Sequence, residues 1–418
     1  MRLGPGIYRG TALAIGLLLS GAVSAVHAQP VADKHFRKTA EAARSSLQAG
    51  DTATARFHLS QLSPDSLFET YVLRVLQLEI TLKQGDILAQ RSAVARVIES
   101  GGVPQERLGY FNYLAGYLSY QTGAIDNAVI YLERARALGT PDPKALLMLA
   151  ESYVRQRKIA QASSMVEEAI TAQESAGQPV PASWYDRAAS LAYKRKNWSD
   201  MARYSAASLK GGGATSEQWR SALTSYGANT KPHGEARLDL YRLQALTGAL
   251  ASERDYHDYA QLAADLGYAI EAKTVLEAGQ GAGALLSSDP VARALTRKIR
   301  RKSIVQLSAI KELPGKAGGA TTALMAMKNG DSLFASSHYV QAISYYRAAL
   351  EKEGVDHDRV MARLGIALAR SGDLDGATIA LGQASGTWGD VAAYWSAWVN
   401  RSRQMAKQEQ PAADVSLQ

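Results

Sequence analysis

The sequence contains no cysteine in its 418 residues, which excludes disulfide bonds, thiolate metal ligands and lipid-modified cysteine. No apolar run after the first thirty residues is long enough to cross a bilayer. Strand-like alternation is also scarce, whereas apolar residues at helical spacing recur from His35 to Met405. Because 46% of the residues are hydrophobic and 21% are charged, we expect a folded, nearly all-helical protein with a large core.

The N-terminal residues are typical of a secretory signal peptide. Arg2 and Arg9 provide a positive start, and the apolar run TALAIGLLLSGAV that follows is too short for a comfortable transmembrane helix. We expect residues 1–28 to be removed by cleavage after Ala28; cleavage after Ala25 and an uncleaved membrane anchor are the alternatives. The mature protein is therefore expected in the periplasm.

The charge balance is mildly basic. The formal net charge is +8, and removal of the two leader arginines lowers it to +6. Such an excess suits anionic peptides, glycans or membrane surfaces, and it is too small to indicate a nucleic-acid partner.

A recurring pattern divides the helical segments. Stretches such as QTGAIDNA, DLGYAIEA and RSGDLDGA each place a glycine and a short turn ahead of an alanine. Ala128 and Ala162 are 34 residues apart, and Ala342 and Ala377 are 35 apart. This period, with a helix, a turn and a helix in each unit, is the spacing of the tetratricopeptide repeat.

The best copy also resembles the tetratricopeptide motif residue by residue. In RLGIALARSGDLDGATIALGQA, Leu364 and Gly365 stand as its Leu-Gly pair, Gly372 lies at its turn, and Ala377 and Ala384 are its two alanines. The resemblance covers about eight repeats, several of them degenerate, and implies an all-α, tetratricopeptide-like solenoid. Glycine inside a helix costs about 1 kcal/mol relative to alanine, so Gly365 predicts a helix crossing too close for a larger side chain.

Interruptions of the pattern predict the domain organisation. The stretches KGGGATS and ELPGKAGG break the helical periodicity twice. The expected segments are an N-terminal repeat array over 29–211, a divergent helical segment over 214–315, a C-terminal repeat pair with a capping helix over 320–405, and a disordered tail over 406–418. The capping helix is expected because Trp388, Val391, Trp395, Trp398 and Met405 fall on one helical face, which we interpret as core.

The resemblance also implies a binding site, because the first helices of such repeats line a concave groove that binds extended peptides. Placing Gly123 at a turn puts four tyrosines at helical spacing on that face, with basic residues nearby. An aromatic and basic groove would suit an acidic peptide or a sugar polymer, and the alternative is that the rings only fill space between repeats. The predicted groove residues are Tyr110, Tyr113, Tyr117, Tyr120, Lys144, Arg155, Arg187, Tyr193 and Lys194.

A second basic feature is the stretch RKIRRKS, residues 297–303, with Arg293 one turn before it. The basic-helix residues singled out are Arg293, Arg297, Arg300 and Arg301. A solvated helix face is the simplest interpretation, and contact with anionic lipid or polymer is the alternative.

No complete catalytic set is present. Glu151 and Ser152 match the Glu-Ser pair of soluble lytic transglycosylases, which are secreted and superhelical, but no lysozyme-like GLMQ segment follows them. Acidic residues around His257 and His357 lie at expected helix starts, where carboxylates favour the helix dipole, so we interpret them as helix caps. We expect no catalysis, no cofactor and no metal site.

Together these patterns predict an exported, non-enzymatic scaffold that binds a protein partner in a cell-envelope assembly for secretion, export or energy transduction. Two alternatives stay open at this point: a glycan-binding subunit of an exopolysaccharide export apparatus, and a peptidoglycan lytic enzyme. The sequence does not identify the partner or the oligomeric state.

Overall fold

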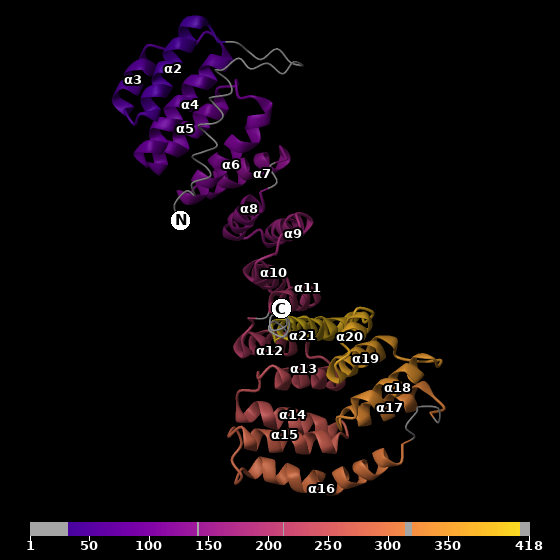
Figure 1. The fold of residues 1–418 in the computed structure, drawn as a ribbon. Coiled ribbons are helices and arrows are strands. Elements are labelled where there is room, and N and C mark those ends of the chain that lie inside the picture. Colours follow the sequence, from indigo (N-terminus) through magenta and orange to yellow (C-terminus); the bar gives the residue numbers. More distant parts are fainter. Residues whose placement is uncertain (1–31, 140–141, 212, 314–319, 410–418) are drawn as a thin grey trace, which may run out of the picture. The chain divides into compact units, whose positions relative to one another are not determined.

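The computed structural model describes residues 32–139, 142–211, 213–313 and 320–409, and over these residues it contains helices and no strand. The chain divides into two compact units, residues 1–179 and 180–418 (Figure 1). The signal-peptide prediction lies outside the described residues.

Unit 1 consists of antiparallel helix pairs, in each of which the second helix packs back on the first. The pairs are α2 (Lys34–Gln48) with α3 (Thr52–Ser60), α4 (Leu67–Gln84) with α5 (Ile87–Glu99), α6 (Gln105–Gln121) with α7 (Ile125–Ala137), and α8 (Pro143–Arg155) with α9 (Ile159–Ser175). Each pair also packs on the next, so unit 1 is a solenoid of helix–turn–helix repeats.

Unit 2 begins with the same kind of pair. Its helices are α10 (Ala182–Lys194), α11 (Trp198–Leu209), α12 (Ser216–Thr230), α13 (Gly234–Leu246), α14 (Glu253–Asp265), α15 (Ala269–Gly281), α16 (Pro290–Lys311), α17 (Ala323–Phe334), α18 (Tyr339–Leu350), α19 (His357–Ser371), α20 (Leu374–Leu381) and α21 (Gly386–Glu409). Consecutive helices pack against one another in the pairs α10–α11, α14–α15, α17–α18 and α19–α20. The predicted all-α, tetratricopeptide-like architecture is confirmed by these repeated pairs.

The turns between paired helices explain part of the sequence pattern. Gly85, Gly123 and Gly372 follow a first helix with φ values of +75°, +77° and +95°, a backbone conformation that glycine adopts without steric cost. Arg157 and Ser337 occupy the same place in their pairs with φ values of 61° and 64°. The turn geometry is therefore kept even where the glycine is replaced.

The predicted close crossing at Gly365 is confirmed. A Cβ atom on Gly365 would lie 2.6 Å from Cγ of Leu381, on the partner helix. Gly116 meets Leu132 in the same way, and Gly330 meets Tyr346, with the partner sixteen residues further along in all three pairs. This repeated register is independent support for the assignment of the repeats.

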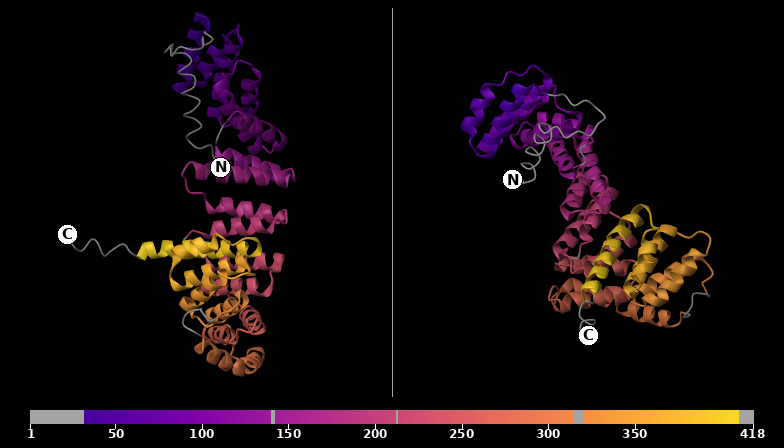
Figure 2. Two further views of the ribbon diagram at one scale, coloured as in Figure 1. Left: turned by 90° about the vertical axis from the view of Figure 1, so that its right-hand side faces the viewer. Right: turned by 45° about the horizontal axis from the view of Figure 1, so that its top comes forward.

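The C-terminal helix α21 connects the two ends of unit 2. It packs against α11 as well as against α19 and α20, as Figure 2 shows. Asp390 of α21 accepts hydrogen bonds from the Ser199 hydroxyl and from the Tyr226 hydroxyl, both at 2.8 Å. Helices at the start of unit 2 are thus held against its last helix.

The unit boundary, the exposure of Met405 and the end of α21 differ from what the sequence predicts. Helices α10 and α11, expected in an N-terminal array that ends at 211, belong to unit 2, whose boundary lies at 179/180. Helix α21 buries Trp388, Val391 and Trp395 as a capping helix should, but Met405 is 45% exposed because that end of α21 reaches beyond its neighbours (Figure 2). The helix also continues to Glu409, into the expected tail.

Candidate functional site

The unit 1 members of the predicted groove lie on the first helices α6 and α8, which are in contact with one another. At their C-terminal ends the Arg155 guanidinium donates a hydrogen bond to the Tyr120 hydroxyl at 3.2 Å and lies 4.7 Å from the centre of the Tyr120 ring. Lys144 is exposed in the first turn of α8, about 16 Å along the helix from Arg155 at 1.5 Å per residue. The structure therefore brings Tyr120 and Arg155 together and places Lys144 at the other end of α8.

The four tyrosines of α6 are not equally accessible. Tyr110, Tyr113 and Tyr120 are half-buried, whereas Tyr117 is 9% exposed and belongs to the core of unit 1. Burial raises the pKa of Tyr110 and of Tyr113 to about 12, and the nearby Asp142 carboxylate adds to the shift at Tyr113. Tyr117 thus fits the space-filling interpretation, while the other three keep part of the ring available for contact.

The remaining predicted groove residues lie on α10, in unit 2. Arg187, Tyr193 and Lys194 are all exposed there. The Tyr193 ring meets the Trp198 ring edge to face, with 5.7 Å between the ring centres. The predicted set is therefore divided between unit 1 and unit 2.

Unit 2 contains a buried charge cluster that sequence analysis did not detect. Arg363 of α19 contacts carboxylates of three helical residues: Glu235 at 2.6 Å, Asp239 at 3.2 Å and Asp331 at 2.5 Å. Arg242 pairs with Asp239 and with Glu271 of α15, both at 2.6 Å. Charges on amphipathic helices are ordinarily solvated, so no local signal marks these residues as buried.

The pKa of Asp331 in this cluster depends on the charged groups packed around it. Burial alone would raise the pKa of Asp331, but the neighbouring Arg363 and Arg359 hold it below its ordinary value. Tyr346 donates a further hydrogen bond to Asp331 at 2.9 Å. An ionised Asp331 is therefore part of the folded state at neutral pH, and it fixes α17 and α18 against α19.

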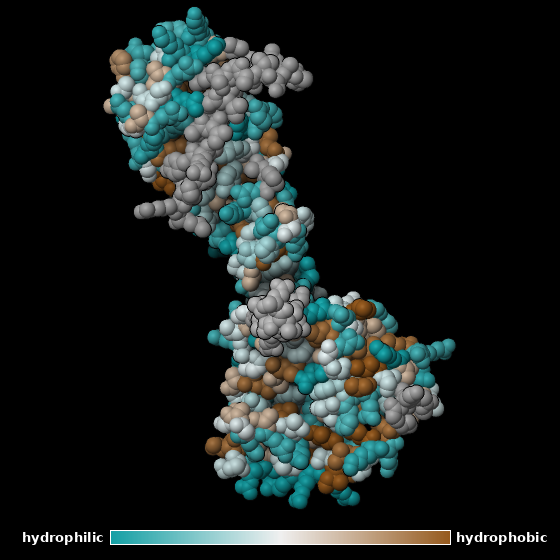
Figure 3. Space-filling model, in the orientation of Figure 1, coloured by the Kyte–Doolittle hydropathy of each residue, from teal (hydrophilic) through white to brown (hydrophobic). Residues whose placement is uncertain are grey.

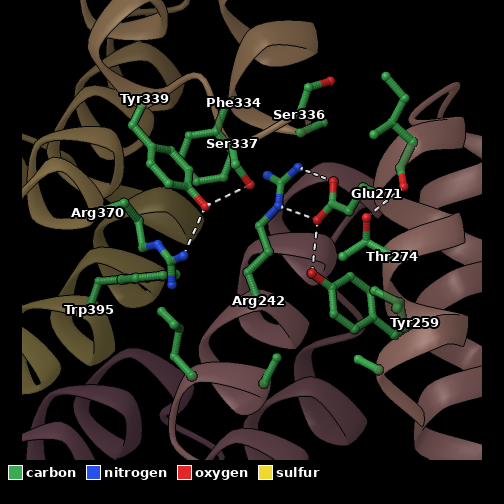
Figure 4. Close-up of a pocket in the computed structure, with 16 residues that line it drawn as sticks. Arg242, Tyr259, Glu271, Thr274, Phe334, Ser336, Ser337, Tyr339, Arg370 and Trp395 are labelled. Atoms are coloured by element: carbon green, nitrogen blue, oxygen red, sulfur yellow. Dashed lines mark hydrogen bonds and ion pairs between the residues drawn. The ribbon is translucent and has the colours of Figure 1, made fainter. Parts of the chain in front are cut away.

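A pocket of about 300 Å³ opens next to this cluster (Figure 4). Arg242 and Glu271 line it together with Trp395, and the Tyr259 hydroxyl donates to Glu271 at 2.8 Å. On the opposite side Arg370 donates to the Tyr339 hydroxyl at 2.8 Å, as Figure 4 shows. Among the described residues no carboxylate forms an ion pair with Arg370, so this side of the pocket offers a cation to a small anionic group.

The predicted basic helix is α16. Arg293, Arg297, Arg300 and Arg301 are all exposed on it. Its buried residues Ala292, Leu295 and Ile299 pack in a cluster with α14 and α15, and the four arginines lie on the exposed side of the helix.

Glu151 and Ser152, the two residues that suggested a lytic enzyme, lie on helix α8. Ser152 is fully buried, and its hydroxyl donates to the Met148 carbonyl at 2.9 Å. Glu151 lies 3.8 Å from the Arg155 guanidinium on the same helix. A catalytic acid needs a desolvated cleft, and Glu151 does not line the pocket beside Arg242.

One group among the described residues has the composition of a metal site: Glu253, His257 and Asp289. Asp289, however, caps α16 by accepting the Ala292 backbone N–H at 2.6 Å, and this hydrogen bond lowers the pKa of Asp289. The capping expected of acidic residues near His257 and His357 is seen at Asp255, in the capping box of α14, and at Asp356, the N-cap of α19.

No family model and no curated protein sequence matches this chain. Among solved structures, a tetratricopeptide repeat protein from Parabacteroides merdae is 12% identical, over 80% of this chain and all of that one, with a TM-score of 0.32. The apo form of RapI is 10% identical over 97% and 95% of the two chains, with a TM-score of 0.33. Yeast Tom70 is 12% identical over 96% and 72%, with a TM-score of 0.24. Scores this low do not identify a relative, and the fold assignment rests on the helix pairs themselves.

Proposed function

We propose that this protein is a non-enzymatic adaptor that binds a protein partner through the face formed by α6 and α8, and that it acts in the periplasm in a cell-envelope assembly. The observation that carries the proposal is the contact between Tyr120 and Arg155, which joins two successive first helices into one aromatic and basic surface.

The chemistry of this face suits a peptide with acidic residues. Half-buried tyrosine rings offer contact area with little conformational entropy left to lose, and aromatic residues and arginine are enriched at binding hot spots. The Arg155 side chain is 46% exposed, so it can pair with a partner carboxylate while its stacking on Tyr120 holds it in place.

The proposed location rests on the amino-acid sequence of residues 1–28, which has the charge and apolar pattern of a signal peptide. In the part of the chain that the structure describes, no helix is long and apolar enough to cross a membrane. Fractionation of cells that produce the full chain tests the location, and a mature protein found in the cytoplasm would overturn it.

Partner binding is tested by affinity capture from envelope extracts with the wild-type chain and two variants. Arg155→Ala removes the cation of the face, and Arg134→Ala removes an exposed cation of α7 as the matched control. We expect capture of the same partner to fall about tenfold or more with Arg155→Ala, as for a hot-spot residue, and to be unchanged with Arg134→Ala. Equal capture by all three proteins would exclude this face as the binding site.

A glycan-binding subunit of an export apparatus is the second candidate, favoured by the exposed arginines of α16. It predicts slower migration of the protein in gels that contain an anionic polysaccharide. The lytic alternative is less well supported by the geometry of Glu151 and Ser152, and it predicts muropeptide release from cell-wall sacculi.

A further inference from the structure

We propose that the outward face of α16 binds the surface of a bilayer that contains anionic phospholipid. This helix carries seven cations and no acidic residue between Pro290 and Lys311. The cations are Arg293, Arg297, Lys298, Arg300, Arg301, Lys302 and Lys311, and every one of them is exposed.

The packing of α16 leaves this face free. Ala292, Leu295 and Ile299 are buried in the cluster formed with α14 and α15. Among the described residues α16 packs mainly on α15 and less on α14 and α17, and Figure 1 shows it at the edge of unit 2. With 22 residues at 1.5 Å per residue, the helix offers an exposed strip about 33 Å long.

The positive charge of the strip is largely unneutralised within the protein. Lys298 pairs with Asp265 at 3.4 Å, and no other cation of α16 forms an ion pair with a described residue. Asp289, the acidic residue just before the helix, is buried as its N-cap. A long face with this charge attracts a surface of the opposite sign.

Apolar side chains lie on the same outward face. Ile304 is 62% exposed and Val305 is 61% exposed, one turn beyond Arg300 and Arg301. At 100° per residue Arg297, Arg301 and Ile304 follow one another along a single stripe of the helix, opposite the buried residues. Figure 3 shows hydrophilic and hydrophobic residues next to one another along the lower edge of unit 2, where Figure 1 places α16.

This combination favours a bilayer over a soluble anionic polymer or an acidic protein surface. Lipid headgroups supply phosphate charges for the arginines, and the acyl boundary just below them can take up Ile304 and Val305. A polysaccharide would satisfy the cations but leave both apolar side chains in water. The proposal is independent of the α6–α8 face and involves other residues.

The experiment is co-sedimentation of the mature chain with vesicles. One set contains phosphatidylglycerol and phosphatidylcholine, the other phosphatidylcholine alone, each at low and high salt. We expect binding to the anionic vesicles at least tenfold stronger than to the neutral ones, and weaker at high salt because the charges are screened. Equal binding to both sets, or none to either, would overturn the proposal.

Two paired variants separate the charge and apolar contributions. Arg297→Gln with Arg301→Gln is expected to reduce binding to anionic vesicles roughly 10- to 30-fold. Ile304→Ser with Val305→Ser is expected to reduce it roughly fivefold or more, because two side chains no longer enter the interface. The matched control is Val340→Ser with Ile379→Ser, two apolar residues that are 74% and 67% exposed elsewhere in unit 2, and it should bind as the wild type does.

Dextran sulfate serves as the probe for the competing polymer interpretation. The Ile304 and Val305 variant could keep full vesicle binding and migrate as slowly as the wild type in gels that contain dextran sulfate. In that case the face recognises charge alone, and the bilayer proposal is wrong. An equal loss with the Val340 and Ile379 control would also overturn it. Circular dichroism melting of each variant checks that these exposed changes leave the fold intact.

Discussion

Arg363 and Asp239 are 124 positions apart in the chain, yet the Arg363 Nε lies 3.2 Å from Oδ2 of Asp239 in the interior of unit 2. The Trp395 indole donates to the backbone carbonyl of the same Asp239 at 3.2 Å. Helix α13 is therefore tied to both α19 and α21. These contacts are long-range within unit 2, and they place a desolvated charge cluster where an ordinary solenoid would have only nearest-neighbour packing.

Replacing Arg363 should destabilise the protein strongly. Arg363→Met leaves Asp239, Asp331 and Glu235 without their shared cation, and breaking a buried pair from one side costs about 3–5 kcal/mol. Chemical unfolding of the wild type and the variant measures the difference. Arg136→Met, which breaks the exposed pair with Glu168, should cost less than about 1 kcal/mol, and a similar cost at both positions would contradict the prediction.

Asp331 should make stability depend on pH in the acid range. Its folded pKa lies below the ordinary value of 3.8, so its stabilising contribution is complete above that value and is lost as the pH falls further. Asp331→Asn should therefore be less stable than the wild type at neutral pH, and the gap should narrow below about pH 3.8. Unfolding curves of both proteins from about pH 2.5 to about pH 7 cover this acid transition and measure the stability difference at each pH. A gap that stays constant over this range would rule out the expected titration.

Gly365→Ala should be destabilising although alanine is the better helix former. The added Cβ would lie 2.6 Å from Cγ of Leu381 and 2.9 Å from its backbone nitrogen, so the two helices must move apart, at a cost of roughly 1–3 kcal/mol. Gly227 of α12 is the matched control because a Cβ there meets nothing within 4 Å. Gly227→Ala should be neutral or stabilising by up to about 1 kcal/mol. The melting temperatures of both variants are compared with that of the wild type. If both shift in the same direction, the close helix crossing is not the cause of the Gly365→Ala effect.

Tyr117 and Tyr120 should respond differently to truncation. Tyr117→Ala removes a ring that is 9% exposed and should cost roughly 3 kcal/mol of folding stability. Tyr120→Ala should change stability by about 1 kcal/mol or less, while it weakens partner capture because Arg155 loses the ring on which it stacks. Melting and capture are measured on the same preparations. A stable Tyr117→Ala protein with lost capture would reverse the assignment of the two residues.

The repeat pattern could be predicted from the sequence because it depends on contacts between consecutive helices. Gly116 and Gly365 sit at the crossings within a pair, and Gly123 and Gly372 at the turns, so their spacing repeats with the helix pair. The basic character of α16 was also visible, since it depends on residue types within a single helix.

The buried charges, the pocket beside Arg242 and the packing of α21 depend on the tertiary structure and could not be predicted from local pattern. Nothing in the local pattern distinguishes Asp239 and Arg363 from solvated charges, because their burial comes from helices that lie more than a hundred residues apart in the chain. The same holds for the pocket beside Arg242, for the packing of α21 on α11, and for the burial of Tyr117 within an otherwise half-exposed tyrosine series. Periodicity determines which residues share a helix face, whereas the elements that cover that face are determined only when distant pairs come together.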